Sequence, residues 1–232
     1  MARARLACMG IPRGGDRAGA TARGRRRLRG GTEVESSLEG PVEGVGSREA
    51  LIGRVREGSR IKYLCFWGHR PLPDGRIGPG CLSQWWPSPF TVAGVEYATA
   101  EHWMMAGKAR LFGDTGAERR VLAAGHPAEA KKAGRLVRGF DEAVWERERL
   151  GIVVAGSVHK FASDPALRRF LLDTGGRVLV EASPVDRVWG IGLSADDERA
   201  RDPERWRGPN LLGFALMAAR ERLRADGPGD GG

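Results

Sequence analysis

Long apolar segments, cysteine pairs and an excess of acidic residues are all missing from this 232-residue sequence. No apolar run approaches the roughly 20 residues that a membrane-spanning helix requires, so we expect no membrane association. Only three cysteines are present, Cys8, Cys65 and Cys81. Without an apolar signal segment, this small odd number argues against a disulfide framework and favours a cytoplasmic protein. Cys65, His69 and Cys81 lack a fourth ligand, so we expect neither a metal site nor a cofactor.

The positive charge of the chain is concentrated at one end. The formal net charge is +9, but residues 1–32 hold nine arginines and one aspartate, which leaves +1 for the other 200 residues. Such a basic arm can hold nucleic acid or another anionic surface without sequence specificity. Residues 1–58 are rich in Gly, Arg, Ser and Glu and almost free of aromatic side chains, so we predict that they are disordered. An unstructured leader with no function of its own is the simpler interpretation.

All seven tryptophans lie within residues 59–225, which we predict to form one domain followed by a loose tail at 226–232. Ala93-Gly94 is typical of a two-residue hairpin turn, and residue alternation predicts short strands at 61–67, 90–92, 95–97 and 177–181. Capping residues and breakers predict six helices, at 99–112, 117–124, 127–138, 141–161, 164–174 and 210–224. The pattern indicates a helix-rich α+β fold and excludes a doubly wound parallel sheet, because strands and helices do not alternate.

The first candidate functional segment is a loop that holds two adjacent tryptophans, Trp85 and Trp86, among prolines and serines. Two neighbouring aromatic rings in such a loop cannot both point into a core as they would on one face of a helix or strand. Aromatic faces presented by a loop are suited to stacking on a flat heterocycle, and we assign this role to Trp86. An aromatic plug that closes the core is the alternative.

The second candidate segment is the helix that begins after Thr99. Glu101 and Lys108 are two turns apart, so they project from one stripe of this helix, with Met105 between them. A carboxylate and an amine about 10 Å apart along a helix can both reach one reacting carbon. A solvated charged face is the alternative for this pair. We predict a packing role for His102.

The third candidate segment is the loop 183–192, which begins with Ser-Pro and contains two glycines. It offers the carboxylate of Asp186 beside the indole of Trp189. Downstream, Asn210 opens the last helix, where its amide and the free backbone N–H groups could hold an anion or a base edge. Simple helix capping is the alternative for Asn210.

In combination these segments resemble the NADAR superfamily. The resemblance rests on four motifs that occur in this order: Leu82–Phe90, Thr99–Lys108, Ser183–Gly192 and Asn210–Gly213. It covers about residues 62–224. Gln84 and Trp85 stand where the family commonly has Asn and Phe, and such differences bear on the substrate more than on the reaction.

The resemblance implies a cofactor-free enzyme that cleaves a bond between ribose C1′ and nitrogen. It implies three possible functions, namely an N-glycosidase acting on ribosylamino-pyrimidine phosphates of riboflavin biosynthesis, a hydrolase that removes ADP-ribose from guanine bases of nucleic acid, or a non-catalytic nucleotide-binding module. Glu101 would act as general acid or base, Asp186 would orient the ribose or assist ring opening, and Lys108 would form a Schiff base or bind phosphate. Trp86 and Trp189 would stack on the base, and Asn210 would read its edge or hold phosphate.

Overall fold

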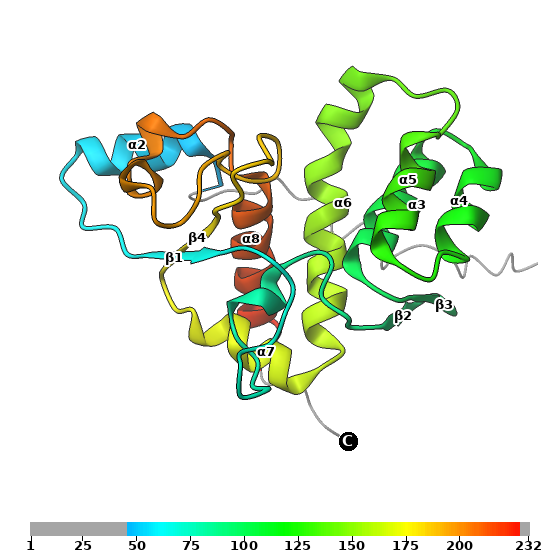
Figure 1. Ribbon diagram of the computed structural model, residues 1–232, viewed down its shortest axis with the longest axis horizontal. Coiled ribbons are helices and arrows are strands. Elements are labelled where there is room, and N and C mark those ends of the chain that lie inside the picture. Colours follow the sequence, from blue (N-terminus) through cyan, green and yellow to red (C-terminus); the bar gives the residue numbers. More distant parts are fainter. Residues whose placement is uncertain (1–45, 228–232) are drawn as a thin grey trace, which may run out of the picture.

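Two long helices, α6 (Glu142–Ala162) and α8 (Leu211–Ala225), pack side by side at the centre of the structure (Figure 1). This structure is a computed structural model, and it describes residues 46–227. The predicted disordered arm up to residue 45, the tail from residue 228 and Cys8 lie outside the described residues. The helix-rich α+β prediction is confirmed, since the remaining helices surround this central pair and the strands are few and short.

The strands form two separate two-stranded ribbons. β1 (Tyr63–Phe66) pairs in parallel with β4 (Val178–Glu181), and five helices lie between them in the sequence. β2 (Phe90–Val92) and β3 (Val95–Tyr97) form the predicted antiparallel hairpin. Both turn residues of this hairpin have positive φ, 50° at Ala93 and 80° at Gly94, as a tight two-residue turn requires.

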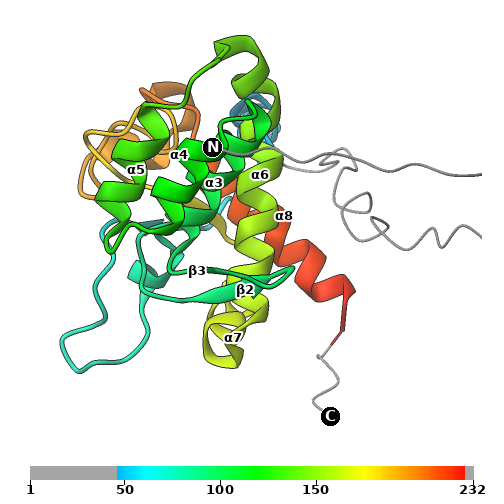
Figure 2. The ribbon, with the colours of Figure 1, turned by 90° about the vertical axis from the view of Figure 1, so that its right-hand side faces the viewer.

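Side-chain caps set the start of each remaining helix. Asp114 caps its helix by accepting the N–H of Ala117 at 2.9 Å, so the second predicted helix begins two residues earlier than expected. His126, followed by proline at the first helical position, starts the next helix, which ends three residues before the predicted end. The helices on one side of α6 (Figure 2) are α3 (Ala100–Leu111), α4 (Thr115–Leu122) and α5 (Pro127–Arg135). Helix α7 (Pro165–Asp173) follows the C-terminal end of α6.

The prediction that residues 1–58 are disordered is wrong for their last part, because Arg48–Arg56 form helix α2. Ser47 caps this helix, and its hydroxyl accepts the N–H of Ala50 at 3.1 Å. Leu51 has no exposed surface and packs in a second apolar cluster against β4. The segment holds too few apolar residues to look foldable alone, but one buried leucine and an existing cluster suffice to order it. Two short 3₁₀ turns, Glu198–Arg201 and Pro203–Arg205, border this cluster.

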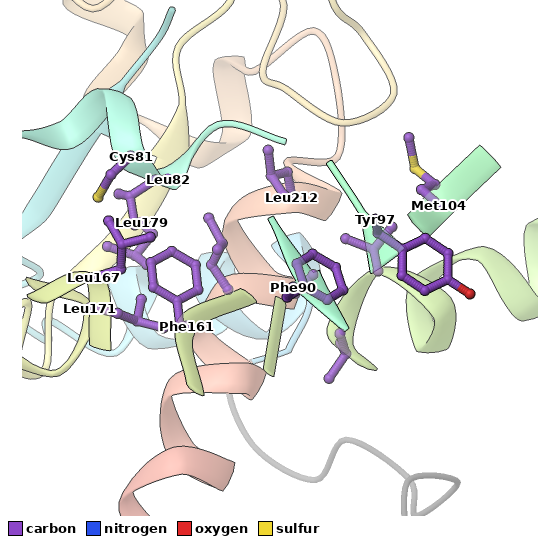
Figure 3. Packing of buried hydrophobic residues seen from close by; sticks show 14 of the residues in the cluster. Cys81, Leu82, Phe90, Tyr97, Met104, Phe161, Leu167, Leu171, Leu179 and Leu212 are labelled. Carbon is purple, nitrogen blue, oxygen red and sulfur yellow. The ribbon is translucent and has the colours of Figure 1, made fainter. Parts of the chain in front are cut away.

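The main core joins both sides of the molecule through α6 and α8. Figure 3 shows Phe161 surrounded by leucines from α7 and β4, with Phe90 and Tyr97 of the hairpin farther along the same cluster. β4 alternates as a strand must: Val178 and Val180 belong to the second cluster, whereas Leu179 belongs to the main core. Glu181 therefore shares the face of Leu179, which is the face of β4 toward the main core.

Within residues 46–227, no helix is both long and apolar enough to cross a membrane. Cys65 and Cys81 are free thiols. The same residues contain no group of three or more His, Cys, Asp or Glu side chains placed to hold a metal ion.

Candidate active site

Helix α3 brings Glu101 into the interior at its first turn. Thr99 caps the helix by accepting the N–H of His102, and the N–H of Glu101 donates to the carbonyl of Gln84 at 3.0 Å. This bond ties the helix to the tryptophan loop. The carboxyl side chain of Glu101 is only 2% exposed. The predicted stripe holds as well, because Met105, one turn along, packs closely against Gly134 of α5.

The carboxyl group of Glu101 lies in an unusual environment for an acid. Its pKa is raised to about 7, chiefly by burial and to a lesser extent by the charge of Asp186, while Lys131 and a hydrogen bond from the Trp85 side chain act in the opposite direction. Its Oε1 atom is buried and has no hydrogen-bond partner. A carboxyl group that titrates near neutrality can donate and accept a proton at working pH, as general acid–base catalysis requires.

Glu181, at the end of β4, is a further acid of the candidate site that the sequence analysis missed. Its pKa is raised to about 8, chiefly by burial and then by the neighbouring carboxyl groups of Asp186 and Glu101. Its Oε2 atom is also buried without a partner. The signal was its position at the end of a predicted strand, directly before the Ser-Pro loop, but a lone glutamate there gives no sign of burial. The buried Glu101 and the half-buried Glu181 thus form a pair of acids from two distant segments.

The loop that carries Asp186 folds back onto this pair. Its Oδ1 accepts the backbone N–H groups of Val188 and Trp189 at 2.9 and 2.7 Å, so one carboxylate oxygen shapes the loop. A side chain at Gly190 would collide with the carbonyl of Glu181, so this glycine permits the close approach. The structure therefore brings Asp186 beside the two glutamates, as its electrostatic effect on both shows.

The predicted ligand-binding role of Asn210 is not supported. Its side chain is fully buried and bonded to β4, with Nδ2 donating to the carbonyl of Leu179 and Oδ1 accepting the N–H of Glu181, both at 2.9 Å. It also makes no side-chain cap, so the capping alternative is wrong too. The N–H groups that start α8 meet the carbonyls of Trp189 and Gly190 rather than open space. Asn210 instead positions Glu181.

The side chains of the adjacent Trp85 and Trp86 lie in different surroundings. Trp86 is half-buried and packs against the main core, as the aromatic-plug alternative describes. Trp85 is the one that reaches Glu101, and its ring also contacts His69 and His126, with centroids 5.7 and 5.8 Å away. Trp189 is half-buried against the main core. Nothing in the sequence distinguishes Trp85 from Trp86, because both side chains are the same indole ring.

Lys108 lies at the other end of the same stripe of α3. Its Nζ is 4.0 Å from the centroid of the Phe140 ring and 5.5 Å from that of Trp145. Burial lowers the pKa of Lys108, and the nearby positive charge of Arg135 lowers it further. No acidic side chain within residues 46–227 forms an ion pair with it. Lys108 and Arg135 therefore make a small positive region, and Arg135 also lowers the pKa of Glu101.

Two buried polar side chains hold the site together from outside. His102 is structural, as predicted, because Nε2 contacts the carbonyl of Ala124 at 3.1 Å and Nδ1 contacts the hydroxyl of Thr99 at 2.8 Å. Lys160 of α6 is fully buried, and its Nζ donates to the carbonyls of Cys81 and Ser83 at 2.6 and 2.7 Å. Lys160 thereby fixes the loop that leads to Gln84 and the tryptophans.

Comparison with known proteins identifies the family of this chain. The model of the NADAR domain matches residues 65–224, which include every site residue described above. An N-glycosidase of Acanthamoeba polyphaga mimivirus is 39% identical over 165 residues, which cover 69% of this chain and 95% of that protein. A chloroplastic riboflavin biosynthesis protein of Zea mays is 37% identical over 101 residues, which cover 42% of this chain and 14% of that protein.

A solved structure has the same architecture. The NMR structure of the Escherichia coli protein YbiA aligns with a TM-score of 0.58 and 25% sequence identity, covering 72% of this chain and 88% of that one. Proteins named YbiA in two Shigella species are N-glycosidases. The family match spans most of the described domain, and the fold and the named relatives agree with it. The chain therefore belongs to the NADAR domain family and is an N-glycosidase, a hydrolase of N-glycosyl bonds.

Proposed function

We propose that the substrate is a ribosylamino-pyrimidine 5′-phosphate, an intermediate of riboflavin biosynthesis, and that the chain hydrolyses its C1′–N bond. The name of the Zea mays relative supports this substrate class. In the reaction, water adds across the bond, so that C1′ gains a hydroxyl group and the nitrogen gains a proton. Both halves of this addition need a proton carrier at C1′.

The observation that carries the proposal is the buried carboxyl group of Glu101. With a pKa of about 7, Glu101 is protonated in much of the population at neutral pH and can protonate the leaving nitrogen. The carboxylate that remains can stabilise positive charge at C1′ and accept a proton from the attacking water. Its unpartnered Oε1 atom supplies a free position for this exchange.

The phosphate end of such a substrate has a matching partner. Lys108 lies two turns from Glu101, a rise of about 10 Å along the helix, which is comparable to the reach of a ribose 5-phosphate. It adjoins Arg135, and both are without an acidic ion-pair partner among residues 46–227. We therefore assign Lys108 to phosphate binding rather than to a Schiff base. The half-buried ring of Trp189 stays the predicted stacking surface for the pyrimidine.

A hollow beside Trp85 favours the second candidate, removal of ADP-ribose from guanine bases. This hollow, of about 380 Å³, is lined by residues that include Trp67, His69 and Arg70. Trp67 is 62% exposed, and His69 contacts Trp85, which in turn reaches Glu101. An exposed indole and a cation beside the site could hold the further nucleotide of a larger substrate.

The test compares both substrates on the full chain. We expect release of ribose 5-phosphate from the ribosylamino-pyrimidine to exceed release of ADP-ribose from modified guanine in DNA. Replacing Glu101 by Gln keeps its shape but removes proton transfer, so turnover should fall by roughly 10²–10⁴-fold in a folded protein. Glu96→Gln, an exposed change on β3, is the control.

Three outcomes would contradict parts of this proposal. Faster turnover of the modified guanine would favour the second candidate. Binding of either substrate without turnover by the wild-type chain would indicate the non-catalytic module. Full activity of Glu101→Gln would remove Glu101 from the mechanism.

A further inference from the structure

Three residues of the candidate site each hold a buried side-chain atom without a hydrogen-bond partner. The atoms are Nε2 of Gln84, Oε1 of Glu101 and Oε2 of Glu181. Gln84 and Glu101 are joined by a backbone hydrogen bond, and the Glu101 and Glu181 carboxyl groups interact electrostatically. Unpaired buried polar groups destabilise a fold, so a cluster of them at one place indicates a ligand that completes their hydrogen bonds.

The backbones of these residues are held in place from several sides. The N–H of Glu181 donates to Asn210, and its carbonyl accepts the N–H of Ile191 at 3.0 Å. Lys160 donates a hydrogen bond to the carbonyl of Ser83, the residue directly before Gln84, and so fixes this part of the loop. The side chain of Gln84 is itself only 7% exposed. Such a preorganised set loses little conformational entropy on binding, as a specific site requires.

The chemistry of the three atoms selects the ligand. The amide nitrogen of Gln84 only donates hydrogen bonds, whereas an ionised carboxylate only accepts them and a protonated carboxyl group does both. Burial and the neighbouring acids Asp186 and Glu101 favour the protonated form of Glu181, and Lys131 opposes this. A phosphate dianion only accepts hydrogen bonds, so it would leave the acceptor oxygens of this cluster unsatisfied. A pair of adjacent hydroxyl groups, each a donor and an acceptor, satisfies it.

The position of Gln84 and Glu181 next to Glu101 identifies the two hydroxyl groups. Glu101 acts at C1′ in the proposed reaction, and the carbon bonded to C1′ carries the 2′-hydroxyl of ribose. We propose that Gln84 and Glu181 bind the 2′- and 3′-hydroxyls of the substrate ribose and so make the enzyme selective for ribose over 2-deoxyribose. This inference rests on the proposed function for the identity of the ligand, but it concerns binding rather than turnover.

Calorimetric titration of the full chain tests the inference without any need for catalysis. The probes are ribose 5-phosphate and 2-deoxyribose 5-phosphate. We expect wild type to bind the ribose compound at least about tenfold more tightly, because the deoxy compound leaves a buried polar group unpaired. Glu181→Leu and Gln84→Leu should each weaken binding of ribose 5-phosphate, and the change at the residue that holds the 2′-hydroxyl should abolish the preference. The control Glu146→Gln, an exposed change on α6, should retain it.

Glu181→Gln separates binding from proton transfer. Glutamine reproduces the donor and acceptor of a protonated glutamate, so this variant should keep the preference for ribose 5-phosphate over 2-deoxyribose 5-phosphate. Loss of turnover comparable to that of Glu101→Gln would overturn the inference, since Glu181 would then be an ionised catalytic base. Equal binding of both sugars by wild type would also overturn it.

The inference and the proposed function fail in different ways. If wild type prefers ribose 5-phosphate but cleaves no ribosylamino-pyrimidine, the reaction is wrong and the hydroxyl site stands. If wild type cleaves the substrate and its deoxy analogue equally well, the reaction stands and the hydroxyl site is wrong. Thermal unfolding of each variant checks folding, and Glu181→Gln remains informative if Glu181→Leu fails to fold.

Discussion

At the scale of single residues, the site depends on two acids, one buried and one half-buried, each with a carboxyl oxygen that the fold keeps away from water. Glu101 reaches its position from the first turn of α3, and Glu181 reaches it from the end of β4. Burial is the largest cause of the raised pKa of each group. Because the two carboxyl groups interact, ionisation of one raises the pKa of the other. The pair therefore retains a proton near neutral pH, where an ordinary glutamate is ionised.

This pair should make the protein less stable as the pH rises. A buried acid with a raised pKa contributes stability below its ordinary pKa of 4.5 and loses it as the pH passes through the folded values of about 7 and about 8. Each group contributes up to about 1.4 kcal/mol per pH unit in this interval. Urea unfolding at pH 5 and pH 8 should show a smaller loss of stability for Glu181→Gln than for wild type. Equal losses would contradict the raised pKa of Glu181.

Lys108 offers a second test at this scale. If it binds phosphate, Lys108→Arg should retain substantial turnover, whereas Lys108→Met should raise KM at least about tenfold for the phosphorylated substrate and leave KM for the dephosphorylated analogue nearly unchanged. Borohydride should trap no sugar on wild type. Lys132→Met, an exposed change on α5, is the control. Loss of all turnover in Lys108→Arg, with trapping on wild type, would instead establish the Schiff base.

At the scale of elements, buried side chains tie the pieces of the site to one another. Lys160 connects α6 to the loop before the tryptophans, and Asn210 connects the start of α8 to β4. Asn210 adopts a left-handed conformation with φ of 60°, which asparagine tolerates better than other residues with a side chain. A side chain at Gly213 would collide with the carbonyl of Leu179, so glycine is needed there. These contacts give Lys160, Asn210 and Gly213 a structural role that does not depend on contact with the substrate.

Removal of the Lys160 link should weaken the whole domain. Lys160→Met keeps a similar volume but leaves the carbonyls of Cys81 and Ser83 without a donor, each at a cost of about 1–3 kcal/mol. We expect the free energy of unfolding to fall by about 2–4 kcal/mol in urea titration. The exposed change Lys62→Met should have an effect within about 0.5 kcal/mol. A variant as stable as wild type would show that water replaces the lysine donor.

At the scale of the whole molecule, the domain extends beyond the family match at its N-terminal side. The match begins at residue 65, but α2 precedes it and closes the second apolar cluster. Arg48 also bonds the carbonyls of Pro203 and Glu204 at 2.7 and 3.0 Å. The face of β4 opposite the active site is therefore covered by a segment from before the family domain.

The cluster under α2 gives a prediction for global stability. Leu51→Ala in the full chain should destabilise the protein by about 2–5 kcal/mol, because it opens a cavity at a fully buried position. Val55→Ala, on the same helix at a position that is 38% exposed, should cost much less. Equal effects in thermal unfolding would mean that α2 does not pack as described.

Local signals in the sequence determined the secondary structure of this protein and part of its site. Caps, prolines and turn glycines act over about four residues, so the hairpin and α3 could be predicted with nearly correct ends. The stripe of Glu101, Met105 and Lys108 followed from helix geometry alone. The family could also be predicted, because its motifs are short and contiguous.

Only the tertiary structure decided which polar side chains are buried and which are free to bind. Glu181 is acidic in any strand, but its raised pKa comes chiefly from burial in the folded chain, and then from Asp186 and from Glu101, eighty residues earlier. Asn210 looked available until its amide was found bonded to β4, and Trp85 differs from Trp86 only in what the folded loop faces. Burial and electrostatic coupling depend on three-dimensional proximity between distant segments, and no pattern within one segment contains that information.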